Sequence, residues 1–193
     1  MTKDELRRIY RQKRIEFSEK ECSVKNMAIV SHLKELDWSA CRYLHVYRAI
    51  RRFNEPDLSD FISWIRIEQP QIDLVVSKSS LFDSGMKHYV WDEDTQFEVN
   101  KWGIPEPVDG YQVAEDLLDT ILVPMLVADK NGNRVGYGKG FYDRFLAQCK
   151  PDVQTIGISY FEVLHIVIDT GYWDIPLKCI VTPERILHID ADQ

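Results

Sequence analysis

A stretch of closely spaced glycines and basic side chains is the part of the chain best suited to chemistry. Residues 133–143 read Asn-Arg-Val-Gly-Tyr-Gly-Lys-Gly-Phe-Tyr-Asp. Glycine lacks Cβ, so its backbone N–H group can approach a ligand closely. A helix that begins after such a loop adds unpaired N–H donors and the positive end of its dipole. Together with Arg134 and Lys139, these groups favour a cradle for a polyphosphate.

The glycine spacing matches neither of the two common phosphate-binding loops. A P-loop requires Ser or Thr after its lysine, but Gly140 follows Lys139. The dinucleotide fingerprint Gly-x-Gly-x-x-Gly would place its third glycine one residue later than Gly140. A surface turn whose charges only keep it soluble explains the composition equally well. The flanking segments therefore have to decide between the two interpretations.

The glycine loop is the last of four segments that occur in a characteristic order. Lys3-x-x-x-Arg7 opens the chain, and Glu55-x-Asp57 follows it. Residues 102–107 then read Trp-Gly-Ile-Pro-Glu-Pro, and residues 129–143 follow the strand that Pro124 ends. In these segments the chain resembles the 5-formyltetrahydrofolate cyclo-ligase (methenyltetrahydrofolate synthetase) family, whose last segment reads Asp-x-x-Gly-x-Arg-Leu-Gly-x-Gly-x-Gly-Tyr-Tyr-Asp. The resemblance spans nearly the full chain and implies a single cyclo-ligase-like domain over residues 1–193.

The resemblance implies an enzyme that converts 5-formyltetrahydrofolate to 5,10-methenyltetrahydrofolate, with ATP as co-substrate, Mg²⁺ as cofactor, and release of ADP and phosphate. Two alternatives stay open. One is a related ATP-dependent enzyme that acts on another formylated or pterin-like substrate. The other is a folate- or nucleotide-binding protein without turnover, which the presence of Lys139 and Asp143 argues against.

The resemblance also assigns roles to individual residues, position by position. Catalysis is expected of Lys139 and Arg134. The residues expected to bind ATP are Lys3, Arg7, Arg134, Gly136, Gly138, Lys139, Gly140 and Tyr142. Those expected to bind the folate are Ile50, Glu55, Trp102 and Tyr137. The expected Mg²⁺ ligands are Asp143 and Asp174.

Several of these residues have simpler interpretations when they are taken alone. The four-residue spacing of Lys3 and Arg7 is typical of a solvated helix face. Glu55 reads as a solvated loop acid, and an aromatic at a turn such as Trp102 more often packs locally. Asp174 reads as a turn aspartate before a proline.

The chain departs from the family pattern in two places. A basic stretch formed by Arg48, Arg51 and Arg52 precedes Glu55, so the alignment there could shift by a residue or two. Tyr137 stands where many relatives have Arg, which could alter contacts with phosphate or substrate.

Composition narrows the class of protein. A formal net charge of −7 argues against a nucleic-acid-binding protein, which needs a basic face. The four cysteines lack Cys-x-x-Cys spacing, and neither a signal-peptide core nor a membrane-spanning run occurs, so we expect a cytoplasmic protein with reduced thiols. Its oligomeric state stays open. The histidines show no metal-ligand spacing and are expected to be structural; they are His32, His45, His88, His165 and His188.

Alternating helices and strands must position these side chains. The capping-box pattern Thr2-x-x-Glu5 predicts a helix over 3–16, and further helical patterns cover 19–36, 58–67 and 142–146. Apolar runs predict strands at 43–47, 72–77, 120–123 and 155–158, and residues 82–107 predict a small β excursion with strands near 87–91 and 95–99. This order predicts a three-layer α/β fold with a mainly parallel sheet and helices on both faces. Ligands bind beyond the carboxyl ends of such strands, where Pro124 and the glycine loop lie.

Overall fold

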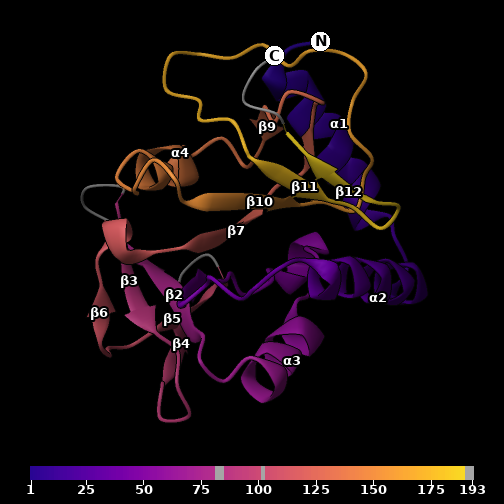
Figure 1. The fold of residues 1–193 in the computed structure, drawn as a ribbon. Coiled ribbons are helices and arrows are strands. Elements are labelled where there is room, and N and C mark those ends of the chain that lie inside the picture. The colour runs from indigo at the N-terminus through magenta and orange to yellow at the C-terminus, as the bar shows by residue number, and fades with distance from the viewer. Residues whose placement is uncertain (81–84, 101–102, 190–193) are drawn as a thin grey trace.

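A twisted sheet of eight strands forms the centre of the computed structural model, which describes residues 1–80, 85–100 and 103–189 (Figure 1). The strand order is β12-β11-β10-β7-β1-β2-β3-β6. The five inner strands are mutually parallel: β11 (Cys179–Val181), β10 (Gln154–Ile158), β7 (Thr120–Pro124), β1 (Tyr43–His45) and β2 (Asp73–Ser79). The outer strands pair antiparallel: β12 (Ile186–His188), β3 (Met86–Val90) and β6 (Gln112–Val113). The sheet is therefore mainly parallel, as the sequence predicted.

Two of the helices begin with a capping box that the sequence dictates. In α1 (Lys3–Ile15), the Glu5 backbone N–H donates to the Thr2 hydroxyl at 3.2 Å, and Glu5 Oε2 accepts from the Thr2 N–H at 2.8 Å. Ser18 and Glu21 make the same pair of bonds at the start of α2 (Glu19–Glu35). These reciprocal bonds satisfy backbone donors that a helix start leaves unpaired. Among the described residues, the structure contains no helix long and apolar enough to cross a bilayer.

Helices cover both faces of the sheet, which confirms the predicted three-layer architecture. On one face α2 and α3 (Ser59–Glu68) pack Leu33 and Phe61 against Leu44 and Ile156 of the sheet. On the other face α4 (Phe141–Leu146) buries Phe145 and Leu146 in a second cluster. Helix α1 places Leu6 against a hairpin formed by β8 (Val127–Ala128) and β9 (Arg134–Val135).

The predicted elements are present, and the shortest strands are additions to them. The predicted helices over 3–16, 19–36 and 58–67 end within one residue of α1, α2 and α3. The expected β excursion is formed by β3 and by a hairpin of β4 (Phe97–Val99) and β5 (Pro105–Pro107). Strands β6, β8, β9, β11 and β12 have two or three residues each, too few for an alternating pattern to stand out.

Two buried histidines are bridged by a serine beneath α4. His45 Nε2 lies 2.7 Å from Ser77 Oγ, and Ser77 Oγ lies 2.9 Å from His88 Nδ1. The His88 ring stacks on Phe145 with 4.1 Å between ring centroids. His45 Nδ1 and His88 Nε2 find no hydrogen-bond partner among the described residues, although Glu115 Oε1 lies 3.6 Å from His88 Nε2. The expectation of satisfied structural histidines therefore holds for only one nitrogen of each. Burial lowers the pKa of His45 well below its usual range and that of His88 to about 4.

Because these two histidines are buried, we expect the free energy of unfolding to fall as the pH is lowered. Below the ordinary histidine pKa of 6.5, the unfolded chain binds more protons than the folded chain, so stability is lost as the pH falls from 6.5 towards 4. Each histidine should remove about 1.4 kcal/mol from the free energy of unfolding per pH unit. Urea denaturation at pH 7, 6 and 5 measures this slope. His88→Asn should flatten it, whereas the exposed His188→Asn should not. An unchanged slope in His88→Asn would refute this origin of acid sensitivity.

Candidate functional site

The glycine loop leaves the β8–β9 hairpin and leads directly into α4. Gly138 and Gly140 have φ of 82° and 66°, a left-handed conformation that glycine adopts without steric cost. A Cβ at Gly138 would lie 2.9 Å from Arg7 Cζ, whereas one at Gly136 would meet nothing within 4 Å. Helix α4 has only six residues, so its dipole adds little to the binding of a phosphate. The loop N–H groups and the neighbouring cations are thus the main features of a phosphate cradle here.

Helix α1 brings its two predicted phosphate-binding cations to this loop. Arg7 Nε donates to the Gly136 carbonyl oxygen at 2.9 Å, and the same guanidinium pairs with Asp4. One turn earlier, Lys3 Nζ lies 2.6 Å from Asp174 Oδ2. Neither contact is a solvated helix face, so that simpler interpretation of Lys3 and Arg7 is wrong.

Arg134 bonds to one predicted metal ligand, Asp143, and senses the charge of the other, Asp174. Its Nη2 donates to Asp143 Oδ1 at 2.6 Å, and its Nη1 donates to the Ile175 carbonyl. Burial lowers the pKa of Arg134, and the charges of Asp143 and Asp174 oppose that shift. The Arg134 guanidinium is therefore already bonded to groups of the protein. Lys139, in contrast, is exposed and makes no ion pair with a described residue.

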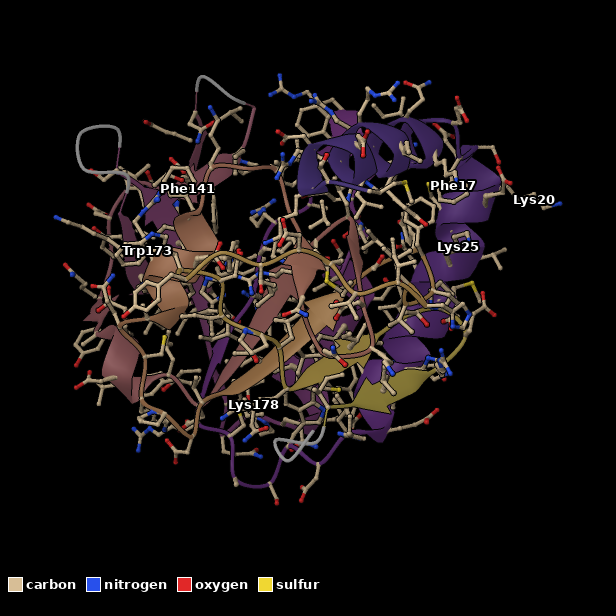
Figure 2. The ribbon with its side chains drawn as sticks, turned by 90° about the horizontal axis from the view of Figure 1, so that it is seen from above. Phe17, Lys20, Lys25, Phe141, Trp173 and Lys178 are labelled. Atoms are coloured by element: carbon tan, nitrogen blue, oxygen red, sulfur yellow. The ribbon has the colours of Figure 1, made fainter. Side chains whose placement is uncertain are left out.

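Asp174 is held by a turn as well as by a charge. Its Oδ2 accepts from the Gly171 N–H at 2.6 Å, which fits the turn aspartate that its local sequence indicates. Burial alone would raise the pKa of Asp174, but the Lys3 ammonium, the Gly171 N–H and the Arg134 charge hold it below its usual value. Asp174 therefore stays ionised. Figure 2 labels the neighbouring Trp173 on the same side of the molecule as Phe141, the first residue of α4.

The donor set of Asp143 and Asp174 fits a magnesium ion that is delivered together with phosphates. The second oxygen of each carboxylate accepts no hydrogen bond from a described residue. Mg²⁺ usually takes one or two carboxylates and completes its octahedron with phosphate and water oxygens. Among the residues that the structure describes, no group of three or more His, Cys, Asp or Glu side chains could hold a metal without such help.

Glu55 is buried beside the loop rather than solvated, so the simpler interpretation of this residue is also wrong. It is 5% exposed, and its Oε2 accepts from the Ile50 N–H at 2.7 Å. Its Oε1 accepts a hydrogen bond from the Tyr137 hydroxyl. Burial raises the pKa of Glu55, and these two bonds together with the charge of Arg14 counteract the rise. Three of the four predicted folate residues thus form one cluster, while Trp102 lies outside the described residues.

Two neighbouring cavities open at the end of β1. The larger, of about 390 Å³, is lined by Glu55 together with Asn26, Arg51 and Tyr160. The smaller, of about 310 Å³, is lined by Arg48, Arg51, Arg52 and Trp91, and also by Gly103, which follows Trp102. Arg51 lines both cavities, so the basic stretch before Glu55 borders the space in which a substrate of Glu55 would lie. Arg48 also stacks over Phe97, with Cζ 4.4 Å from the ring centroid.

The sequence interpretation missed Arg14, which is 1% exposed and bonded through each guanidinium nitrogen. Nε donates to the Phe53 carbonyl at 2.8 Å, Nη1 to the Met125 carbonyl at 3.3 Å, and Nη2 to the Tyr137 hydroxyl. The spacing of the basic residues in α1 could have identified Arg14 from the sequence. Arg7 and Arg14 are seven residues apart, two helical turns, and so lie on the same face of α1 as Lys3.

Comparisons with known proteins identify the family of the chain. A sequence model of the 5-formyltetrahydrofolate cyclo-ligase family matches residues 1–183. The 5-formyltetrahydrofolate cyclo-ligase of Haemophilus influenzae is 36% identical over 98 residues, which are 47% of this chain and 52% of that protein. That of Mycolicibacterium smegmatis is 34% identical over 87 residues, 44% of this chain and 45% of that protein. In these alignments the chain spans about half the length of the curated relatives.

Solved structures extend the likeness to the whole fold. The 5,10-methenyltetrahydrofolate synthetase of Aquifex aeolicus superimposes with a TM-score of 0.84 and 29% identity, covering 100% of this chain and 95% of that one. The 5,10-methenyltetrahydrofolate synthetase of Mycoplasma pneumoniae gives a TM-score of 0.73 and 25% identity, covering 94% of this chain and 98% of that one.

Proposed function

The chain belongs to the 5-formyltetrahydrofolate cyclo-ligase family, and on that premise we propose that it converts 5-formyltetrahydrofolate to 5,10-methenyltetrahydrofolate, with ATP as co-substrate and release of ADP and phosphate. One observation carries the proposal. Two consecutive residues of the glycine loop contact the two proposed substrate sites. The Gly136 carbonyl accepts from Arg7 on the ATP side, and the Tyr137 hydroxyl donates to Glu55 on the folate side.

The proposed chemistry begins with activation of the formyl group. The N5-formyl group is an amide, and its oxygen is a poor leaving group. Transfer of the γ-phosphoryl group of ATP to that oxygen makes a phosphate ester. The folate N10 then attacks the formyl carbon, N10 loses its proton, the carbon–oxygen bond breaks and phosphate leaves. The product carries a positive five-membered ring, and no covalent bond to the protein is needed.

The side chains of the site would supply position and charge. The loop N–H groups, Lys3 and Arg7 would hold the triphosphate, and Lys139 would stabilise the charge on the transferred group. A Mg²⁺ ion held by Asp143 and Asp174 would neutralise phosphate charge when bound. Arg134 would hold Asp143 in place through its 2.6 Å bond. Ile50 and Glu55 would anchor the pterin, and Tyr142 is proposed to border the nucleotide.

The test is a direct assay of the purified chain. Mixed with 5-formyltetrahydrofolate and Mg-ATP, it should produce the absorbance of methenyltetrahydrofolate and one ADP per product, and no product without ATP. ATP turnover with another formylated or pterin-like compound, but not with this substrate, would favour a divergent enzyme. Binding of folate or nucleotide without ATP consumption would favour a binding protein. Either result would overturn the proposed reaction.

Asp143→Asn is expected to raise the Mg²⁺ concentration needed for half-maximal activity severalfold, because a neutral amide is a poorer ligand for a hard cation. Excess chelator should abolish the activity of the unmodified chain, and added Mg²⁺ should restore it. Activity and calorimetric Mg-ADP binding, both titrated with Mg²⁺, measure the change.

The matched control is Asp169→Asn, an exposed aspartate five residues before Asp174. The melting temperature of both variants must also be measured, because Asp143→Asn removes the negative charge that pairs with the buried Arg134 and can lower stability. A lower melting temperature with an unchanged Mg²⁺ requirement would restrict Asp143 to a structural role.

A further inference from the structure

Arg14 connects α1 to the proposed folate site through a single phenol group. Its Nη2 donates to the Tyr137 hydroxyl, and that hydroxyl donates to Glu55 Oε1. The guanidinium carbon also lies 5.5 Å from the centroid of the Tyr137 ring. The two remaining guanidinium bonds, to the Phe53 and Met125 carbonyls, fix the arginine from two further segments. The guanidinium therefore has one defined position relative to Glu55.

This arrangement answers a problem that Glu55 poses. A carboxylate that is 5% exposed loses most of its hydration, and a buried acid without a nearby positive charge tends to take up a proton. No cation among the described residues forms an ion pair with Glu55. Arg14 is the charge that reaches it, through the Tyr137 hydroxyl. The Arg14 bond polarises that hydroxyl, which makes it a stronger donor to the carboxylate.

We propose that Arg14 and Tyr137 form a positioning relay that holds Glu55 as an ionised, oriented acceptor for the N–H donors of the substrate. The proposal rests on the proposed function and adds to it a residue that touches neither substrate. It makes Arg14 a specificity determinant. An ionised Glu55 selects a ligand edge that presents N–H donors, such as an aminopyrimidine, whereas a protonated Glu55 would present a donor of its own.

The relay gives substrate affinity a distinct pH dependence. The titratable and charged groups that face Glu55 or share its cavity are Arg14, Tyr47, Tyr137, Tyr142, Tyr160, Glu19, Cys22, Arg51, Asp57 and Asp60. Burial raises the pKa of each of these four tyrosines, so they stay neutral across the assay range. Loss of Arg14 removes a charge that lowers the pKa of Glu55. The acidic limb of kcat/KM for the folate should therefore move to higher pH.

Two variants test the relay in the full-length chain. Tyr137→Phe removes only the hydroxyl, and Arg14→Met removes the charge. Each should raise KM for the folate about tenfold, leave KM for ATP nearly unchanged, and shift the acidic limb of the folate kcat/KM upward. Arg14→Lys keeps the charge and should retain the original limb. Tyr10→Phe is the matched control, because it removes a hydroxyl that accepts and donates no bond among the described residues.

A double-mutant cycle with Glu55→Gln separates the relay from simple stabilisation of the fold. If Arg14 and Tyr137 act through Glu55, then in the Glu55→Gln background neither change should raise KM for the folate further. Additive effects, equal rises in both KM values, or an unmoved pH limb would overturn the proposal. If Arg14→Met fails to fold, the KM values and the pH limb of Tyr137→Phe alone test the proposal. An unmodified chain that makes no methenyltetrahydrofolate would instead overturn the proposed function, which keeps the two failures distinct.

Discussion

Lys139→Ala is expected to lower kcat by about 10²–10³. Lys139 is exposed and makes no ion pair with a described residue, so its ammonium is available to a transferring phosphoryl group. The neighbouring cations are committed to other contacts: Arg7 to Gly136 and Asp4, Lys3 to Asp174, and Arg134 to Asp143 and Ile175. Removing the uncommitted cation should therefore cost transition-state stabilisation that no neighbour replaces. Steady-state assays at saturating folate and Mg-ATP measure the loss.

Lys130→Ala is the control for this variant, because Lys130 is an exposed lysine in the turn between β8 and β9. It should leave kcat nearly unchanged. Both variants should unfold at almost the same temperature as the unmodified chain, since exposed lysines add little to stability. A Lys139→Ala enzyme with normal turnover would remove the catalytic role from this lysine and with it the phosphate-cradle interpretation of the loop.

The sequence predicted those features of the site that local spacing controls. Lys3 and Arg7 share a helix face because they are one turn apart, and that face does meet the glycine loop. The capping box at Thr2 predicted where α1 begins. The apolar run before Pro124 predicted a buried strand, and the strand occupies the middle of the sheet. Each of these predictions uses residues that are neighbours in the chain.

Contacts between distant segments could not be predicted in the same way. The burial of Glu55 depends on Tyr137, which lies 82 residues away, and the hydroxyl–carboxylate bond leaves no trace in either local sequence. The partner of Lys3 is 171 residues away by sequence number, in a loop whose sequence suggested only a turn. The bridge between His45 and His88 passes through Ser77 on a third strand. Such pairs become neighbours only when the sheet brings their strands together.

The basic stretch before Glu55, which departs from the family pattern, has defined contacts in the structure. Arg48 stacks over Phe97 and Trp91 and lines the smaller cavity with Arg52, whereas Arg51 lines both cavities. Despite the extra charges, the Ile50 N–H still donates to Glu55 at 2.7 Å across the short helix η1 (Arg51–Phe53). The arginines therefore border the proposed folate site while Glu55 keeps its bond to the Ile50 N–H, and the assignment of Glu55 to that site stays a prediction.

Glu55→Gln is expected to raise KM for the folate about ten- to a hundredfold, because a charge-assisted hydrogen bond contributes roughly 1.5–3 kcal/mol. The structure adds a second reason. Both carboxylate oxygens already accept bonds, from the Ile50 N–H and the Tyr137 hydroxyl. A glutamine has only one acceptor oxygen, so its amide N–H₂ must face one of those donors or the substrate. KM for ATP and kcat should change little, since uniform binding of one ligand is what is lost.

The opposite pattern is expected for Arg7→Ala, which should raise KM for ATP and leave KM for the folate nearly unchanged. Two titrations, each varying one substrate at saturating levels of the other, compare the variants. Glu162→Gln is the control, because Glu162 also accepts a hydroxyl hydrogen bond, from Thr182, but lines neither cavity. If Glu55→Gln raised KM for ATP alone, the folate would have to bind elsewhere. The bond between Glu55 and Tyr137 would then serve to order the nucleotide loop, in which Tyr137 directly follows Gly136.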